Sequence, residues 1–200
     1  MKRPLVVIGT SLGGLDALTE VLGSLPGETP APIAVVQHRR PDGDSRLADL
    51  LSRRCVLPVQ EAQDKDPIER SHVYVAPADY HLLVDGEVFH LNVDEPVSWA
   101  RPSIDVLFES AAESDEWHVI AVLLTAASED GAAGIEAVAT AGGVTIVQDP
   151  ASARSAVALR AALARTRVDH VLPLDEIAHR LVSLLLGTGT SGTQRSGAQS

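Results

Sequence analysis

Three polar residues at widely separated positions could together supply a nucleophile, a general base and a carboxylate. Ser11 lies in the pentapeptide Gly-Thr-Ser-Leu-Gly at 9–13, a G-x-S-x-G pattern that can present a serine hydroxyl on a sharp strand-to-helix turn. His38 and Asp130 each follow another apolar run. An imidazole that takes the proton of a serine hydroxyl, and a carboxylate that orients this imidazole, are the groups used in acyl transfer.

Each of these residues also has a purely structural interpretation. Ser11 could cap the helix that follows its turn. His38 could end a strand as a polar group that is satisfied under the next loop, and Asp130 could be the N-cap of the following helix. Other carboxylates could take the third position instead: Asp79, Asp105 and Asp149. The joint placement of the three residues favours the triad over any of these separate interpretations.

The elements that must position these residues alternate between strands and helices. Apolar runs typical of buried strands predict strands at 5–8, 33–37, 56–60, 73–76, 119–124, 144–148 and 170–172. Apolar residues at helical spacing predict helices at about 15–25, 47–51, 104–111, 132–141, 156–164 and 175–186. This alternation predicts a three-layer α/β/α fold with a doubly wound, mainly parallel sheet. Ligands of such folds bind beyond the carboxyl ends of the strands, and Ser11, His38 and Asp130 all fall there.

The second predicted helix follows a polar loop at 39–44. Its spacing predicts that Leu47, Leu50 and Leu51 form the buried face. Asp44 or Ser45 is the expected N-cap.

The segment 81–92 is predicted to form an antiparallel hairpin. Two β-favouring runs flank Asp85-Gly86, a strong signal for a two-residue turn. If these two residues form the turn, His81 lies opposite His90. The two histidines could share a metal or form a half-solvated pair, and with no third ligand nearby the pair is favoured, so no metal is expected.

Composition and charge restrict the classes of function. A chain of 200 residues with 45% hydrophobic and 22% charged residues is typical of one ordinary globular domain. The net charge of -11 argues against nucleic acid and against an anionic membrane surface. Cys55 is the only cysteine, which excludes an internal disulfide and fits a reducing cytoplasm.

No targeting or membrane segment is evident in the sequence. The apolar run near the N-terminus stops at Gly9, too early for a signal peptide, and no run is long enough for membrane insertion. A cytoplasmic location is therefore expected. We expect one domain over 1–187 and a disordered tail over 188–200, which contains no large apolar residue.

Several longer segments resemble one known family in order and spacing. They are VVIGTSLGGLDAL, VVQH, YVAPADYHL, RPSIDVLFESAA, the DGAAG at Asp130, IVQDP and VDHVLPLDEIAHRL. These segments resemble the catalytic domain of CheB, the chemotaxis protein-glutamate methylesterase and glutamine deamidase family. The resemblance extends from about Leu5 to Leu186.

The resemblance implies a serine carboxylesterase that hydrolyses glutamyl methyl esters on a methylated chemoreceptor-like protein, with deamidation of glutamine as a related activity. It implies Ser11 as nucleophile, His38 as general base and Asp130 as the acid that orients the base. It offers backbone N–H groups near Ala127 and at Leu12, at the start of the first helix, as oxyanion donors. It implies no cofactor and no metal.

The chain departs from the family pattern at three places. Leu12 replaces a hydroxyl residue after the nucleophile, Ala-Ala-Ser at 126–128 replaces Gly-Met-Gly, and Val-Ala-Leu at 157–159 replaces Gly-Met-Pro. The chain also starts at the first strand, so we expect no attached receiver domain, and a separate receiver protein becomes a candidate regulator. These departures leave one alternative, a catalytically impaired relative that binds a signalling partner.

A dinucleotide-binding oxidoreductase is a weaker hypothesis. The G-x-G-x-x-G pattern would require glycine in place of Ser11. It would also require an acidic residue where the second strand ends in His38.

Overall fold

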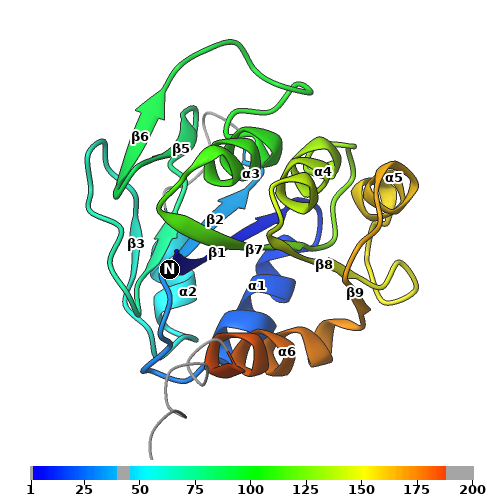
Figure 1. Cartoon of the computed structure of the whole chain (residues 1–200), viewed down its shortest axis with the longest axis horizontal. Coiled ribbons are helices and arrows are strands. Elements are labelled where there is room, and N and C mark those ends of the chain that lie inside the picture. Colours follow the sequence, from blue (N-terminus) through cyan, green and yellow to red (C-terminus); the bar gives the residue numbers. More distant parts are fainter. Residues whose placement is uncertain (1, 40–45, 188–200) are drawn as a thin grey trace, which may run out of the picture.

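A seven-stranded parallel sheet lies at the centre of the molecule (Figure 1). The structure is a computed structural model that describes residues 2–39 and 46–187. The strand order is β3-β4-β2-β1-β7-β8-β9. The strands are β1 (Arg3–Thr10), β2 (Ile33–Gln37), β3 (Val59–Glu61), β4 (Val73–Val75), β7 (Trp117–Leu123), β8 (Val144–Gln148) and β9 (His170–Leu172).

Strand β1 is the point where the winding of the sheet reverses. From β1 the chain proceeds to β2, β3 and β4 on one side, where β4 lies between β2 and the edge strand β3, and later to β7, β8 and β9 on the other. Strands β1, β2 and β7 are therefore neighbours, and their carboxyl ends meet at the switch point where doubly wound folds bind ligands. Ser11, His38 and Asp130 follow these three strands.

Helices cover both faces of the sheet, which confirms the predicted three-layer α/β/α fold (Figure 1). One apolar core joins the sheet to α3 (Ile104–Glu113), α4 (Ala132–Thr140) and α5 (Val157–Arg165). A second core on the other face joins it to α1 (Gly14–Gly23), α2 (Leu47–Ser52) and α6 (Leu174–Gly187). No helix within the described ranges has both the length and the apolar character needed to cross a membrane.

The short helix α2 differs from its prediction. Leu47 and Leu51 are buried, but Leu50 is 44% exposed and does not belong to the core face. A helix of only six residues buries a narrow face, which here consists of Leu47, Ala48 and Leu51. The N-cap is Arg46, whereas Asp44 and Ser45 lie outside the described residues. The tail predicted at 188–200 also lies outside them.

The third strand is shorter and later than predicted. It spans Val59–Glu61 rather than 56–60, and Val56 is 74% exposed. The pairing with β4 begins only at Val59, which lies opposite Val73. The residues before it therefore have no neighbouring strand to hold them in a ladder.

The hairpin forms a separate two-stranded antiparallel sheet of β5 (His81–Asp85) and β6 (Val88–Asn92). Its predicted register is wrong. Asp85 pairs with Val88, so Gly86 is the first of the two turn residues, and its φ of 60° suits a turn with glycine in that position. His81 consequently lies opposite Asn92 rather than opposite His90, so neither the favoured pair of histidines nor the alternative of a shared metal keeps its geometric basis.

Candidate active site

Ser11 lies on the turn between β1 and α1. Its backbone N–H donates to Thr125 O on the neighbouring strand at 2.9 Å. Gly13, with φ of 82°, is the N-cap residue of α1, and no side chain caps this helix. Within the described residues the Ser11 hydroxyl has no hydrogen-bond partner, so it is not held as a helix cap and lies free at the surface of a cleft.

A partly buried glutamine, Gln37, links the turn that carries Ser11 to the end of the strand that precedes His38. The Gln37 side-chain amide donates to Ser11 O at 2.8 Å and to His38 O at 3.1 Å. The first residue of α1 must be small here, because a Cβ on Gly14 would lie 1.9 Å from Gln37 Oε1. Gln37 was not among the residues predicted from the sequence, although a polar residue at the end of a buried strand was a usable signal.

The His38 imidazole is hydrogen-bonded to the Asp130 carboxylate. The distance from His38 Nε2 to Asp130 Oδ2 is 2.6 Å, and the two side chains are 15% and 0% exposed. The alternative carboxylates have other partners: Asp79 pairs with Arg101, Asp105 accepts from Gly131 and Gly134, and Asp149 accepts from Ala151.

Asp130 caps a helix, but not the helix that follows it. Its carboxylate accepts the backbone N–H groups of Ile104 at 2.7 Å and Asp105 at 3.1 Å, and the hydroxyl of Ser103 at 2.8 Å. These groups form the N-terminus of α3, whose positive end of the dipole stabilises an anion. Burial by itself raises the pKa of Asp130, but the hydrogen bonds from His38 and Ile104 outweigh it and lower the pKa below its ordinary value. The acid therefore stays ionised beside the imidazole.

The Asp105 carboxylate in turn accepts backbone N–H groups at the N-terminus of α4. Its Oδ1 accepts the N–H groups of Gly131 at 2.9 Å and Gly134 at 2.7 Å, at the start of α4. Asp130, which precedes α4, thus caps α3, and Asp105, which lies in α3, caps α4. Burial, together with the nearby charge of Asp130, raises the pKa of Asp105 to about 6. The backbone N–H of Asp105 donates to Asp130 Oδ1, so the two residues are also linked directly.

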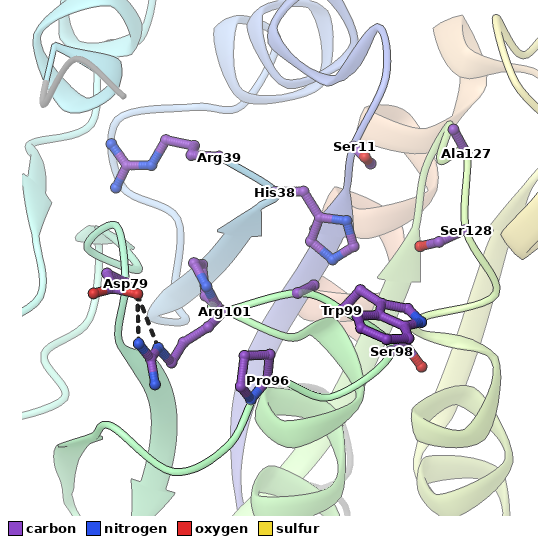
Figure 2. Close-up of a pocket in the computed structure, with 12 residues that line it drawn as sticks. Ser11, His38, Arg39, Asp79, Pro96, Ser98, Trp99, Arg101, Ala127 and Ser128 are labelled. Carbon is purple, nitrogen blue, oxygen red and sulfur yellow. Dashed lines mark hydrogen bonds and ion pairs between the residues drawn. The ribbon is translucent and has the colours of Figure 1, made fainter. Parts of the chain in front are cut away.

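Ser11 and His38 line the same cleft, as Figure 2 shows. Because Nε2 is bonded to Asp130, Nδ1 is the ring nitrogen left for the serine hydroxyl. Ser11 and His38 are not hydrogen-bonded to each other in this structure. In proteins without substrate such contacts are often long and tighten only when the substrate binds.

The cleft has two adjoining hollows. One of about 440 Å³ extends from Ser11 towards Trp99 and Arg101, and one of about 660 Å³ extends towards Leu12. Both are lined by Ser11, His38 and Ala127. The Ser11 site therefore lies in an open groove rather than in a lidded cavity.

Two backbone N–H groups at this groove are available as donors. No acceptor within the described parts of the chain bonds the N–H of Leu12 or that of Ala127. Neither Ala126 nor Ser128, the two residues that stand in place of glycines, has a left-handed φ, so the replacements cause no strain of that kind. The Leu12 side chain is 48% exposed and lines the larger hollow.

The family model for CheB methylesterase matches residues 6–181. The chain belongs to the CheB methylesterase family. A crystal structure of the Thermotoga maritima CheB methylesterase catalytic domain superposes with a TM-score of 0.87 at 33% identity, and covers 92% of this chain and 100% of that one.

Curated members of the family are also similar in sequence. A protein of Leptospira interrogans is 40% identical over 185 residues, which make up 92% of this chain and 96% of that protein. Another, from Anaeromyxobacter dehalogenans, is named protein-glutamate methylesterase/protein-glutamine glutaminase 2. It is 43% identical over 179 residues, but this chain covers only 52% of its length.

Proposed function

We propose that this CheB-family protein hydrolyses γ-methyl esters of glutamyl residues on a chemoreceptor-like protein, with Ser11, His38 and Asp130 as its catalytic groups. The observation that supports this most strongly is the 2.6 Å bond between His38 Nε2 and the fully buried Asp130, in the cleft that Ser11 lines. A methylated chemoreceptor-like protein is then the partner, and the cytoplasm is the compartment in which we place the reaction.

Acylation begins with transfer of a proton from the serine. With Nε2–H donated to Asp130, Nδ1 of His38 has a free lone pair and takes the Ser11 proton as Oγ attacks the ester carbonyl carbon. Asp130 holds this tautomer and stabilises the imidazolium that forms. The N–H groups of Leu12 and Ala127 are our candidate donors to the oxyanion, each worth about 3 kcal/mol in related sites.

The remaining steps return the enzyme to its starting state. His38 gives its proton to the departing methoxide, and methanol leaves an acyl group on Ser11. A water molecule, deprotonated by the same imidazole, attacks the acyl carbon. The bond from this carbon to Ser11 Oγ then breaks, His38 returns the proton to Oγ, and the glutamate product leaves after losing its own proton to solvent. Glutamine would follow the same steps with ammonia as the leaving group, so deamidation is a related activity. These steps require protein groups and water only.

A methyl-esterified glutamyl peptide tests the proposal. Mass spectrometry follows the conversion of the ester to glutamate by the wild type, by Ser11→Ala and by His38→Gln. We expect conversion by the wild type and its loss in both variants, by a factor on the order of 10³ to 10⁶. Wild type and Ser11→Ala that are equally inert would refute the esterase proposal and favour a binding role.

A further inference from the structure

The most exposed large apolar side chain of the described structure stands at the groove that contains Ser11. Trp99 is 101% exposed, whereas Trp117, the other tryptophan, is 3% exposed and buried in the core. Trp99 lines the hollow that Ser11 and His38 also line, and in the view of Figure 2 its indole lies below the imidazole. The large apolar surface of a tryptophan makes its exposure to water unfavourable. Tryptophan is also enriched among the residues that contribute most to binding at interfaces.

The backbone under Trp99 is held in an unusual conformation. Val97 and Ala100 exchange two backbone hydrogen bonds of 3.1 and 2.9 Å around a tight turn. Both central residues are left-handed, with φ of 50° at Ser98 and 65° at Trp99. Glycine and asparagine suit such positions, whereas a tryptophan is strained there. Strain of this kind persists mainly where function requires it.

A side-chain clamp fixes the base of this turn. The Arg101 guanidinium donates to Asp79 Oδ1 from Nε at 3.0 Å and from Nη2 at 2.7 Å (Figure 2). Its Nη1 donates to Val93 O at 2.8 Å and to Asp94 O at 3.0 Å. Trp99 is therefore carried by a supported turn, so that binding at its indole has little backbone freedom to lose.

Apolar surface is also present on the other side of the nucleophile. Leu12 and Leu15 are 48% and 39% exposed and line the larger hollow. A polypeptide that crosses Ser11 would therefore meet apolar surface on both sides of the reacting glutamate, in contrast to a small ester that fills only the centre of the groove.

We infer that Trp99 is a specificity-determining residue whose indole packs against an apolar side chain of the substrate polypeptide, next to the esterified glutamate. This inference rests on the proposed function. Trp99 binds the polypeptide and takes no part in the chemical steps. Its contribution falls on the affinity for polypeptide esters, and the selectivity of the enzyme for them over small esters depends on it.

The test compares two esters with the same reacting group. One is a peptide with a γ-methyl glutamate and leucines among the neighbouring residues, and the other is the γ-methyl ester of N-acetylglutamate. Trp99→Gly removes the indole and retains a residue that suits a left-handed turn. We expect it to lower the ratio of kcat/KM for the peptide to that for the small ester by about tenfold or more, through KM. Trp99→Phe should restore most of the ratio. Val56→Ala, at an exposed residue before β3 and remote from the groove, is the matched control.

A binding measurement keeps the inference separate from the proposed catalysis. In a Ser11→Ala background, calorimetry gives the Kd of the peptide with and without Trp99→Gly, and we expect Kd to rise about tenfold. A peptide with serines in place of the leucines should bind weakly to both proteins. An unchanged Kd, or a fall in kcat/KM that is equal for both esters, would overturn the role assigned to Trp99. Failure of the wild type to hydrolyse either ester would refute the proposed function alone, because the Kd comparison still decides the inference.

Discussion

Replacing Asp130 by asparagine removes one charge and one acceptor oxygen from a buried carboxylate that accepts four hydrogen bonds. If the new amide nitrogen takes the place of Oδ2, it faces the donors His38 Nε2–H and Ile104 N–H. The imidazole then has to move its proton to Nδ1, the nitrogen that we assign to Ser11. In the other orientation, the amide nitrogen faces Asp105 N–H. In both, the charge that stabilises the imidazolium is lost.

The size of the effect follows from these contacts. A base in the wrong tautomer costs about 10⁴ in kcat in the serine hydrolase that is best described. One backbone N–H at the start of α3 loses its acceptor, which costs about 1–3 kcal/mol of stability. We therefore expect Asp130→Asn to fold, with a lower free energy of unfolding, and to retain about 10⁻⁴ of the wild-type kcat.

Asp105→Asn is the matched control for this substitution. It makes the same chemical change in the reciprocal carboxylate, which caps α4 and does not bond His38. Turnover of the methyl-esterified peptide and urea unfolding are measured for both variants. We expect Asp105→Asn to change kcat by less than about tenfold, since it acts on the base only through its neighbour.

The comparison has a clear refuting result. If Asp130→Asn costs less than about tenfold in kcat while it lowers stability, Asp130 is a helix cap and not the acid that orients the base. Equal losses of kcat in the two variants would likewise show that both substitutions act through the helix ends alone.

Three further predictions concern the residues that support the site. Because folding raises the pKa of Asp105 from 3.8 to about 6, the folded protein binds that proton more tightly than the unfolded chain, and the stability it contributes falls as pH rises across that interval. Asp105→Asn should therefore gain stability relative to wild type from low to high pH in urea unfolding, and a constant difference would contradict the shift. Gly14→Ala should lower kcat by about 10² because its Cβ would displace the Gln37 amide. Gly27→Ala, with open space around it, is the control and should leave kcat unchanged. Equal kcat values for Gly14→Ala and the wild type would exclude this role of the glutamine. Ser103→Ala should cost about 1 kcal/mol in thermal unfolding through loss of the α3 cap, and an unchanged Tm would show that the cap is dispensable.

Much of the sheet follows from short-range signals in the sequence. Strands β2, β8 and β9 have the predicted bounds, because each apolar segment is delimited by residues that end a strand. The hairpin register could not be read in this way. Asp85-Gly86 allows the glycine to be the first or the second turn residue, and the choice depends on burying Val84 opposite Phe89.

The positions of the candidate site residues could be predicted from the sequence, but the hydrogen bonds that hold them could not. The order of the elements already placed Ser11, His38 and Asp130 after β1, β2 and β7, at one edge of the sheet. The bonds from α3 to Asp130 depend on how closely that helix approaches β1, where a Cβ on Gly9 would lie 2.2 Å from Ile104. Such tertiary contacts leave no periodic signal. The exposure of Trp99 could not be predicted either, because a single tryptophan in a loop gives no indication of what it faces.

In the proposed reaction Ser11 forms a covalent acyl intermediate, and an activated ester of a γ-glutamyl peptide tests this most directly. With a good leaving group, acylation outpaces hydrolysis, so the released alcohol is recorded in rapid mixing and the acid-quenched protein is mapped by mass spectrometry. We predict a burst stoichiometric with enzyme, an acyl group on the peptide that contains Ser11, and neither in Ser11→Ala. An adduct on another residue, or a Ser11→Ala variant that hydrolyses the ester at the wild-type rate, would contradict the claim.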